Sequence, residues 1–141
     1  LPMAAAEGLA VLPYSPLGGG LLTGKYGVDR QPTTGRIVDN AMYTTRYGDE
    51  RNFAVASALT ALAAEVGVHP VSLAIAWVAS HPAVTAPLIG ARDLEQLEPA
   101  LAAVDVEMTD ELRARISALS PSPPPATDRN EETSAHNYGS R

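Results

Sequence analysis

The chain has 141 residues, of which 45% are hydrophobic and 5% aromatic, and its formal net charge at pH 7 is −6. This length suits one domain whose core is built mainly from aliphatic side chains. The negative charge argues against a nucleic-acid partner held on a basic surface, and the lack of cysteine excludes disulfides and thiolate metal sites.

The first predicted elements are a helix end and a buried strand. Residues 1–8 (LPMAAAEG) favour a helix, and Gly8 can take the left-handed conformation that ends it. Residues 9–15 (LAVLPYS) form a nearly continuous apolar run, which predicts a strand buried on both faces. Pro13 removes one backbone donor near the end of that strand.

A long loop and two helices follow the strand. Residues 18–52 show weak periodicity and many polar residues and glycines, which predicts a loop. From Phe53 an apolar face repeats at helical spacing until Gly67 ends the helix. Pro70 suits a first helical position, and residues 71–80 are apolar nearly all round, so this second helix should be buried.

The last third predicts one more strand and two more helices. Residues 84–90 (VTAPLIG) read as a short apolar strand, and the helix over 93–103 opens with Asp93 and Gln96 at capping-box spacing. Pro99 should kink that helix, and Thr109 should cap a final helix. Residues 121–141 are polar and rich in proline, which predicts a disordered tail.

Strands that alternate with helices indicate an α/β fold with parallel strands. Two buried strands cannot make a self-sufficient sheet, because each keeps an unpaired edge. The fold is therefore expected to be incomplete within this chain. The chain begins with Leu1 rather than Met, which fits a piece of a longer polypeptide.

Several classes of location and partner are disfavoured by the sequence. No apolar run approaches the roughly 20 residues that span a bilayer, and no signal peptide opens the chain. We therefore expect a soluble cytoplasmic protein without a membrane or nucleic-acid partner. The histidines at 69, 81 and 136 are too scattered to predict a metal site. The sequence leaves the oligomeric state open.

Glycines and cations follow both predicted strands. Ligands collect at the carboxyl ends of strands in parallel α/β folds, so the two segments should meet there. Glycines allow a close approach of the backbone to an anion, and Lys25 and Arg92 add positive charge. Arg92 also stands just before a predicted helix start, which itself favours an anion. Together these features predict a phosphorylated ligand.

These same residues resemble the carboxyl-terminal part of an aldo-keto reductase. The resemblance is carried by GLAVLPYSPLGGGLLTGKYG, LAIAWV, VTAPLIGARDLEQL and LRARISALS, in the order of the family. The combination of S-P-L-x-x-G-x-x-x-G-K-Y with G-A-R-x-x-x-Q is specific, and it covers residues 1–120. The resemblance implies a (β/α)₈ TIM barrel, of which this domain would hold the seventh and eighth strands and a C-terminal helix.

The resemblance also implies NADPH or NADP⁺ as cofactor and a small carbonyl compound as substrate. The ring of Tyr14 would stack on the nicotinamide, Lys25 would meet the phosphates, and Arg92 would meet the adenosine 2′-phosphate. The remaining implied cofactor residues are Ser15, Pro16, Leu17, Gly18 and Gly19 along the dinucleotide bridge, and Gly90 and Gln96 on the adenosine half. Where the family commonly has Glu and Asn against adenine, this chain has Pro99 and Ala100, which weakens or rearranges those contacts.

Two functions stay open at this stage. The first is an oxidoreductase that reduces aldehydes or ketones with NADPH in the complete protein, with this chain as its cofactor-binding part. The second is a truncated remnant or interaction module without catalysis. The family's catalytic Asp, Tyr, Lys and His belong to the first half of the barrel, so no catalytic residue is assigned in this chain.

Other prominent residues have simpler interpretations. Trp77 should belong to the core, with its indole N–H bonded to a partner. His69 and His81 should cap turns beside prolines. Arg30 and Arg36 could reach the cofactor from the long loop, but we favour solvated surface charges for both.

Overall fold

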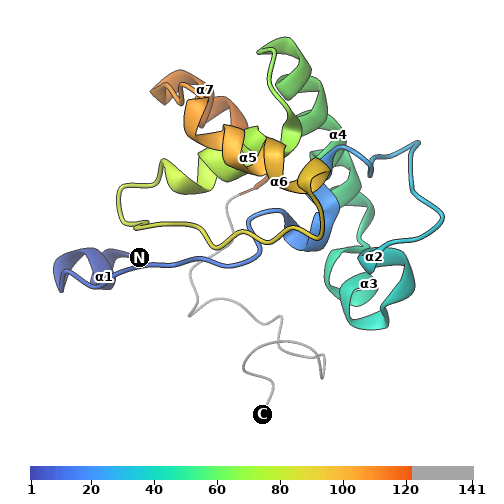
Figure 1. The fold of residues 1–141 in the computed structure, drawn as a ribbon, viewed down its shortest axis with the longest axis horizontal. Helices are drawn as coiled ribbons and strands as arrows, with labels where there is room; N and C mark the ends of the chain where they lie inside the picture. Colours follow the sequence, from blue (N-terminus) through green and yellow to red (C-terminus); the bar gives the residue numbers. More distant parts are fainter. Residues whose placement is uncertain (122–141) are drawn as a thin grey trace.

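The computed structural model describes residues 1–121, so the predicted disordered tail lies outside the described residues except for Pro121. Helices dominate this part of the chain (Figure 1). Its elements are α1 (Pro2–Ala6), the 3₁₀ helix η1 (Gly18–Thr23), α2 (Arg36–Asp39), α3 (Ala41–Tyr47), α4 (Glu50–Glu65), α5 (Pro70–Ala79), α6 (Leu94–Leu101), the 3₁₀ helix η2 (Ala102–Asp105) and α7 (Asp110–Ser117).

The two predicted strands are extended segments that pair in parallel but do not form regular strands. Tyr14 and Leu88 form an isolated parallel bridge. The Leu88 amide donates to the Pro13 carbonyl at 2.8 Å, and the Thr85 amide donates to the Val11 carbonyl at 2.9 Å. The prediction of two regular strands is therefore wrong for residues 1–121, although their parallel direction is right. Neither segment has a second described neighbour, and proline interrupts both, so the ladder does not extend.

The expectation that the first strand is buried on both faces is also wrong. The helices α5, α6 and α7 lie on one side of the extended pair (Figure 1). The side chains of Leu9, Leu12 and Leu88 remain 54%, 51% and 53% exposed. An apolar surface of the pair therefore stays uncovered within residues 1–121.

The predicted helix pair is confirmed. Asp49 begins α4 by accepting from the Arg51 amide, and Gly67 follows its end in the left-handed conformation, with φ of +74°. His69 begins α5 by accepting from the Val71 amide, and Pro70 is its first residue. Six successive residues of α5, 71–76, are buried, as the all-apolar pattern predicted.

The main core lies between α4, α5 and α7. Its buried members are Leu59, Leu62, Ala63, Leu73, Ala74 and Ile116. Trp77 is half-buried and packs against this cluster, so its assignment to the core is confirmed. A neighbouring cluster joins α5 to α6 and η2 through Val71, Ile75, Ala76, Ala100 and Ala103.

The caps of the last two helices are confirmed. The Asp93 carboxylate accepts from the Gln96 amide at the start of α6, and Thr109 Oγ1 accepts from the Leu112 amide at the start of α7. Pro99 lies inside α6, which continues to Leu101 before the chain tightens into η2. The kink expected at Pro99 stays a prediction.

Residues 18–52 are not a simple loop, which corrects the sequence prediction. They contain η1, α2 and α3. Together with α4 they form a small core, whose members are Leu21, Tyr26, Ile37, Phe53 and Ala56. These apolar residues are too widely spaced to show a helical period. Local capping by Asn40, which accepts from the Met42 amide, starts α3 instead.

Within the described part of the chain, no single helix is long and apolar enough to cross a membrane. The helices α4 and α5 pass that test only as a pair bent by 98°. The most apolar stretch of the pair, residues 71–76, is buried against other helices. This is the pattern of core helices.

Candidate functional site

The paired segments bring the two predicted halves of the cofactor site to one end of the pair. Tyr14 and Leu88 are bridge partners, 74 residues apart in sequence. Because the segments run in parallel, Ser15 and the glycines leave the pair at the same end as Gly90 and Arg92. This is the arrangement that the sequence predicts for a ligand at the carboxyl ends of neighbouring strands.

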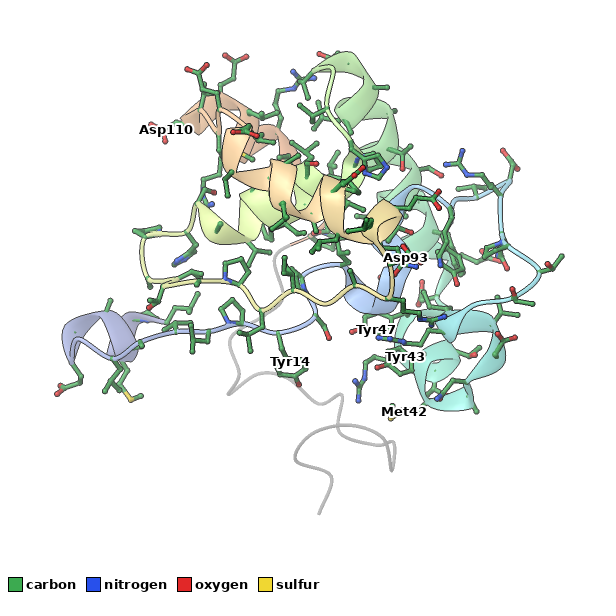
Figure 2. All side chains as sticks on the ribbon, in the orientation of Figure 1. Tyr14, Met42, Tyr43, Tyr47, Asp93 and Asp110 are labelled. Atoms are coloured by element: carbon green, nitrogen blue, oxygen red, sulfur yellow. The ribbon has the colours of Figure 1, made fainter. Side chains whose placement is uncertain are left out.

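Tyr14 presents an accessible aromatic ring at that end. Its side chain is 62% exposed, and Figure 2 shows it pointing away from the helices. The backbone beside it is held by the bridge to Leu88. The exposed part of the ring offers a flat aromatic surface to a planar ligand.

A tight turn follows Tyr14 and leads into the glycines. Ser15 has a positive φ of 55°, which is uncommon for a residue other than glycine. Its carbonyl accepts from the Gly18 amide at 3.0 Å, and the Leu17 carbonyl accepts from the Gly20 amide at 3.1 Å. Pro16 and Leu17 are half-buried, and Leu17 packs against two core clusters. The turn is thus anchored to the core.

The three glycines shape the turn through their backbone conformation more than by offering free hydrogen-bond donors. Gly18, Gly19 and Gly20 have φ values of +56°, +68° and +103°, a region that other residues rarely adopt. The amides of Gly18 and Gly20 already donate within the turn. These two amides are therefore not available to donate to an anion, contrary to what the sequence suggests. The lack of side chains still allows an anion to come close to the backbone.

Lys25 lies next to the last of these glycines. A Cβ atom placed on Gly20 would lie 4.0 Å from Lys25 Nζ. The ammonium also lies 5.5 Å from the centroid of the Tyr26 ring, which is buried beneath it. A cation on an exposed side chain beside accessible backbone suits an anionic ligand.

The second segment carries Arg92 at the start of α6. Gly90 has open space around its Cα, and Arg92 is exposed. The Gln96 side chain is used locally, because its Oε1 accepts from the Arg92 amide at 3.4 Å and its Nε2 donates to Asp93 at 3.3 Å. Asp93 and Glu95 place negative charge at this helix start, which offsets the attraction of the helix end for an anion. The positive charge here comes from Arg92.

The structure adds two aromatic residues that sequence reasoning missed. Tyr43 and Tyr47 on α3 lie beside one another (Figure 2), with ring centroids 6.0 Å apart. A Cβ atom placed on Gly19 would lie 2.7 Å from the Tyr43 ring and 3.2 Å from the Tyr47 ring. The guanidinium of Arg36, an exposed residue, lies 5.4 Å from the centre of the Tyr43 ring. The spacing of the two tyrosines by four residues was the available signal.

The predicted turn roles of the two described histidines are confirmed. His69 Nδ1 accepts from the Val71 amide, and His81 Nδ1 accepts from the Ala83 amide, both at 3.1 Å. Among residues 1–121, no three His, Cys, Asp or Glu side chains are grouped so that they could hold a metal ion.

Two surface grooves lie away from the predicted cofactor residues. One, of about 490 Å³, runs between the start of α5 and η2 and is lined by His69, Ser72, Glu98 and Asp105 among others. The second, also about 490 Å³, lies between α4 and α7 beside Glu65 and Arg115. Neither groove includes a predicted cofactor residue.

Comparison with known proteins identifies relatives that match most of this chain. A family model described as the aldo/keto reductase family matches residues 1–121. An uncharacterized oxidoreductase of Mycobacterium bovis is 37% identical over 113 residues, which cover 80% of this chain and 34% of that protein. Protein tas of Escherichia coli is 33% identical over 115 residues, which cover 80% of this chain and 32% of that protein.

Two further similarities extend this comparison. A probable voltage-gated potassium channel subunit beta of Oryza sativa is 33% identical over 132 residues, covering 91% of this chain and 40% of that protein. The structure of a glycerol dehydrogenase from Gluconobacter oxydans matches with a TM-score of 0.67 and 26% identity, covering 88% of this chain and 39% of that one. The chain thus spans between 32% and 40% of the length of these relatives.

Proposed function

Because the chain belongs to the aldo/keto reductase family, we propose that it supplies the cofactor-binding part of a protein that reduces aldehydes or ketones with NADPH. In this proposal the paired segments are the last two strands of a (β/α)₈ barrel. The observation that carries it is the parallel pairing of Tyr14 with Leu88, which sets the glycine turn and Arg92 at one end. When bound, the nicotinamide of NADPH supplies the hydride.

The residues present fit such a dinucleotide. Tyr14 offers an exposed ring for the nicotinamide. The turn of Ser15, Pro16 and Leu17 would run along the pyrophosphate that joins the two halves of the dinucleotide. Gly18 and Gly19 would follow the pyrophosphate without a side chain of their own, and Lys25 lies beside the next glycine, Gly20, with positive charge.

The adenosine half would lie along the second segment. Arg92 would pair with the 2′-phosphate, with Gly90 leaving open space beside it. A charge-assisted contact of this kind is worth roughly 1.5 to 3 kcal/mol. Gln96 would reach the adenosine only after giving up its contacts with Arg92 and Asp93.

A second function is favoured by the uncovered apolar surface of the paired segments. Leu9, Leu12 and Leu88 are each more than half exposed. In a complete barrel, neighbouring strands would cover such a surface. In a truncated product it would make the chain an interaction module without catalysis.

Calorimetric titration with NADPH and with NADH separates these functions. The polypeptide that carries this chain should bind NADPH, and it should bind NADH more weakly because NADH lacks the 2′-phosphate. A matched titration with an Arg115→Ala variant, whose charge pairs with Glu65 away from the site, should give the same affinities. Absence of binding for both nucleotides would contradict the cofactor proposal and leave the interaction module.

A further inference from the structure

The glycine turn is in close contact with two aromatic rings from α3. A Cβ atom placed on Gly19 would lie 2.7 Å from Tyr43 Cδ1 and 3.2 Å from Tyr47 Cε2. A Cβ atom on Gly18 would lie 3.6 Å from Tyr47 Cε1. At Gly19, therefore, only glycine fits against the rings, for a steric reason that is separate from its positive φ.

The two rings are themselves held in place. They stand four residues apart on α3, at an interplanar angle of 30°, and both pack against the small core that contains Tyr26 and Phe53. The helix that carries them is capped by Asn40 and is bonded to α2 through Thr44 Oγ1 and the Ile37 carbonyl. The tyrosines thus pack the flexible glycine turn, Gly18–Gly20, against the fixed surface of α3.

We propose that Tyr43 and Tyr47 are positioning residues that hold Gly18–Gly20 in the left-handed turn that receives the pyrophosphate of the dinucleotide. This inference rests on the proposed function. Three successive glycines lose more conformational entropy on ordering than any other residues. Rings packed against the turn order it before the ligand arrives, so that less of this cost falls on binding.

Replacement of Tyr43 tests this role in the polypeptide that carries the chain. Tyr43→Ala should quicken hydrogen exchange at the Gly18 and Gly20 amides, which donate within the turn. It should also weaken NADPH binding by roughly tenfold, because the entropy cost of ordering the glycine turn then falls on the binding step. Tyr43→Phe keeps the ring and should preserve both exchange and affinity.

A control variant separates positioning from general loss of packing. Ile37→Val removes one methylene from the same small core but leaves both rings against the glycines. It should lower stability without changing exchange at Gly18 and Gly20 or the affinity for NADPH. Equal effects of Ile37→Val and Tyr43→Ala on affinity would overturn the proposal.

A glycine pair gives an independent test if Tyr43→Ala fails to fold. Gly8 and Gly19 have similar φ values of +63° and +68°, but a Cβ atom on Gly8 meets open space. Gly19→Ala should therefore weaken NADPH binding and disturb the turn, whereas Gly8→Ala should do neither. Where Tyr43→Ala does fold, the double variant Gly19→Ala with Tyr43→Ala should be less impaired than the sum of the two single changes, because the closest contact, that with Tyr43 Cδ1 at 2.7 Å, is removed.

The outcomes distinguish this inference from the proposed function. If wild-type protein does not bind NADPH, the proposed function fails, and the exchange measurement still reports whether the rings order the turn. If NADPH binds but Tyr43→Ala leaves exchange or affinity unchanged, the positioning role is wrong while the proposed function stands.

Discussion

The indole N–H of Trp77 donates to Ser117 Oγ at 3.0 Å and so joins α5 to α7 across 40 residues of sequence. The Ser117 hydroxyl in turn donates to the Arg113 carbonyl at 2.8 Å, and the Arg113 guanidinium lies 5.8 Å from the centre of the Trp77 ring. Arg113 also donates to the Trp77 carbonyl at 3.0 Å. These contacts of Trp77 and its polar partners therefore hold α7 on α5, in addition to the packing of Ile116 in the main core.

Loss of the Ser117 hydroxyl should destabilise this junction. We expect Ser117→Ala to lower the free energy of unfolding by roughly 0.5 kcal/mol, the low end for one hydrogen bond, because the indole N–H loses its protein partner at an exposed position where water can replace it. Urea unfolding followed by the emission of Trp77, the single tryptophan of this chain, measures the change. Ser120→Ala, at an exposed position beyond α7, is the matched control and should have no effect. Equal stability of the two variants would contradict the assigned bond.

The role proposed for Arg92 predicts a change of nucleotide preference. Arg92→Ala should weaken NADPH binding roughly ten- to a hundredfold, the range expected for loss of one charge-assisted contact. Binding of NADH should be nearly unchanged, because that nucleotide has no 2′-phosphate. Calorimetry with both nucleotides measures the ratio, and equal weakening of both would rule out a contact with the 2′-phosphate.

Helices were predictable from this sequence because their signals are local. The Asp93 and Thr109 caps, Pro70 at a first helical position and Gly67 after a helix each act within one turn of backbone. The structure confirms all four. The parallel relation of residues 9–15 and 84–90 was also predictable, because helices separate the two apolar runs.

The regularity of the strands and the order within residues 18–52 were not predictable in the same way. A strand depends on neighbours that this sequence does not identify, and Tyr14 has its described bridge only to Leu88. The packing of Tyr43 on Gly19 joins residues whose separation has no periodic signature. Such contacts come from tertiary packing rather than from local propensity.

Asp49 should titrate as an unusually strong acid. Hydrogen bonds from the side chain and the backbone amide of Arg51 lower the pKa of the Asp49 carboxyl to about 2. Its stabilising contribution is then fully present above the ordinary value of 3.8 and is lost as the pH falls through about 2. Carboxyl chemical shifts followed by NMR measure this pKa. Arg51→Gln should raise the Asp49 pKa toward its ordinary range, and an unchanged value would contradict the pairing.

Two glycines with similar backbone conformations should respond differently to alanine. Gly24 and Gly67 have φ values of +87° and +74°, so both replacements strain the backbone by about 1 to 2 kcal/mol. At Gly24 the added Cβ atom would also lie 2.9 Å from Pro70 Cγ, whereas at Gly67 it meets open space. Gly24→Ala should therefore lower the free energy of unfolding by about 1 kcal/mol more than Gly67→Ala does. Urea unfolding of the two variants tests the order, and an equal loss would show that Pro70 yields.

Tyr26 should titrate late and should make the protein sensitive to alkali. Burial of its side chain, which is 1% exposed, raises the pKa of the phenol above its ordinary value of 10.0. The neutral form is favoured in the folded state, so this contribution to stability is complete below pH 10.0 and is lost as the pH rises through the raised value.

Tyr26→Phe keeps the ring between Phe53 and the Lys25 side chain but removes the ionisable hydroxyl. The variant should lack the latest phenol transition in absorbance at alkaline pH, and its stability should fall less steeply than that of the wild type above pH 10.0. If both proteins lose stability in parallel over this range, ionisation of Tyr26 does not drive the alkaline transition. That outcome would mean that the small core around Tyr26 accommodates the phenolate without extra loss of stability, so that burial does not set the alkaline limit of the fold.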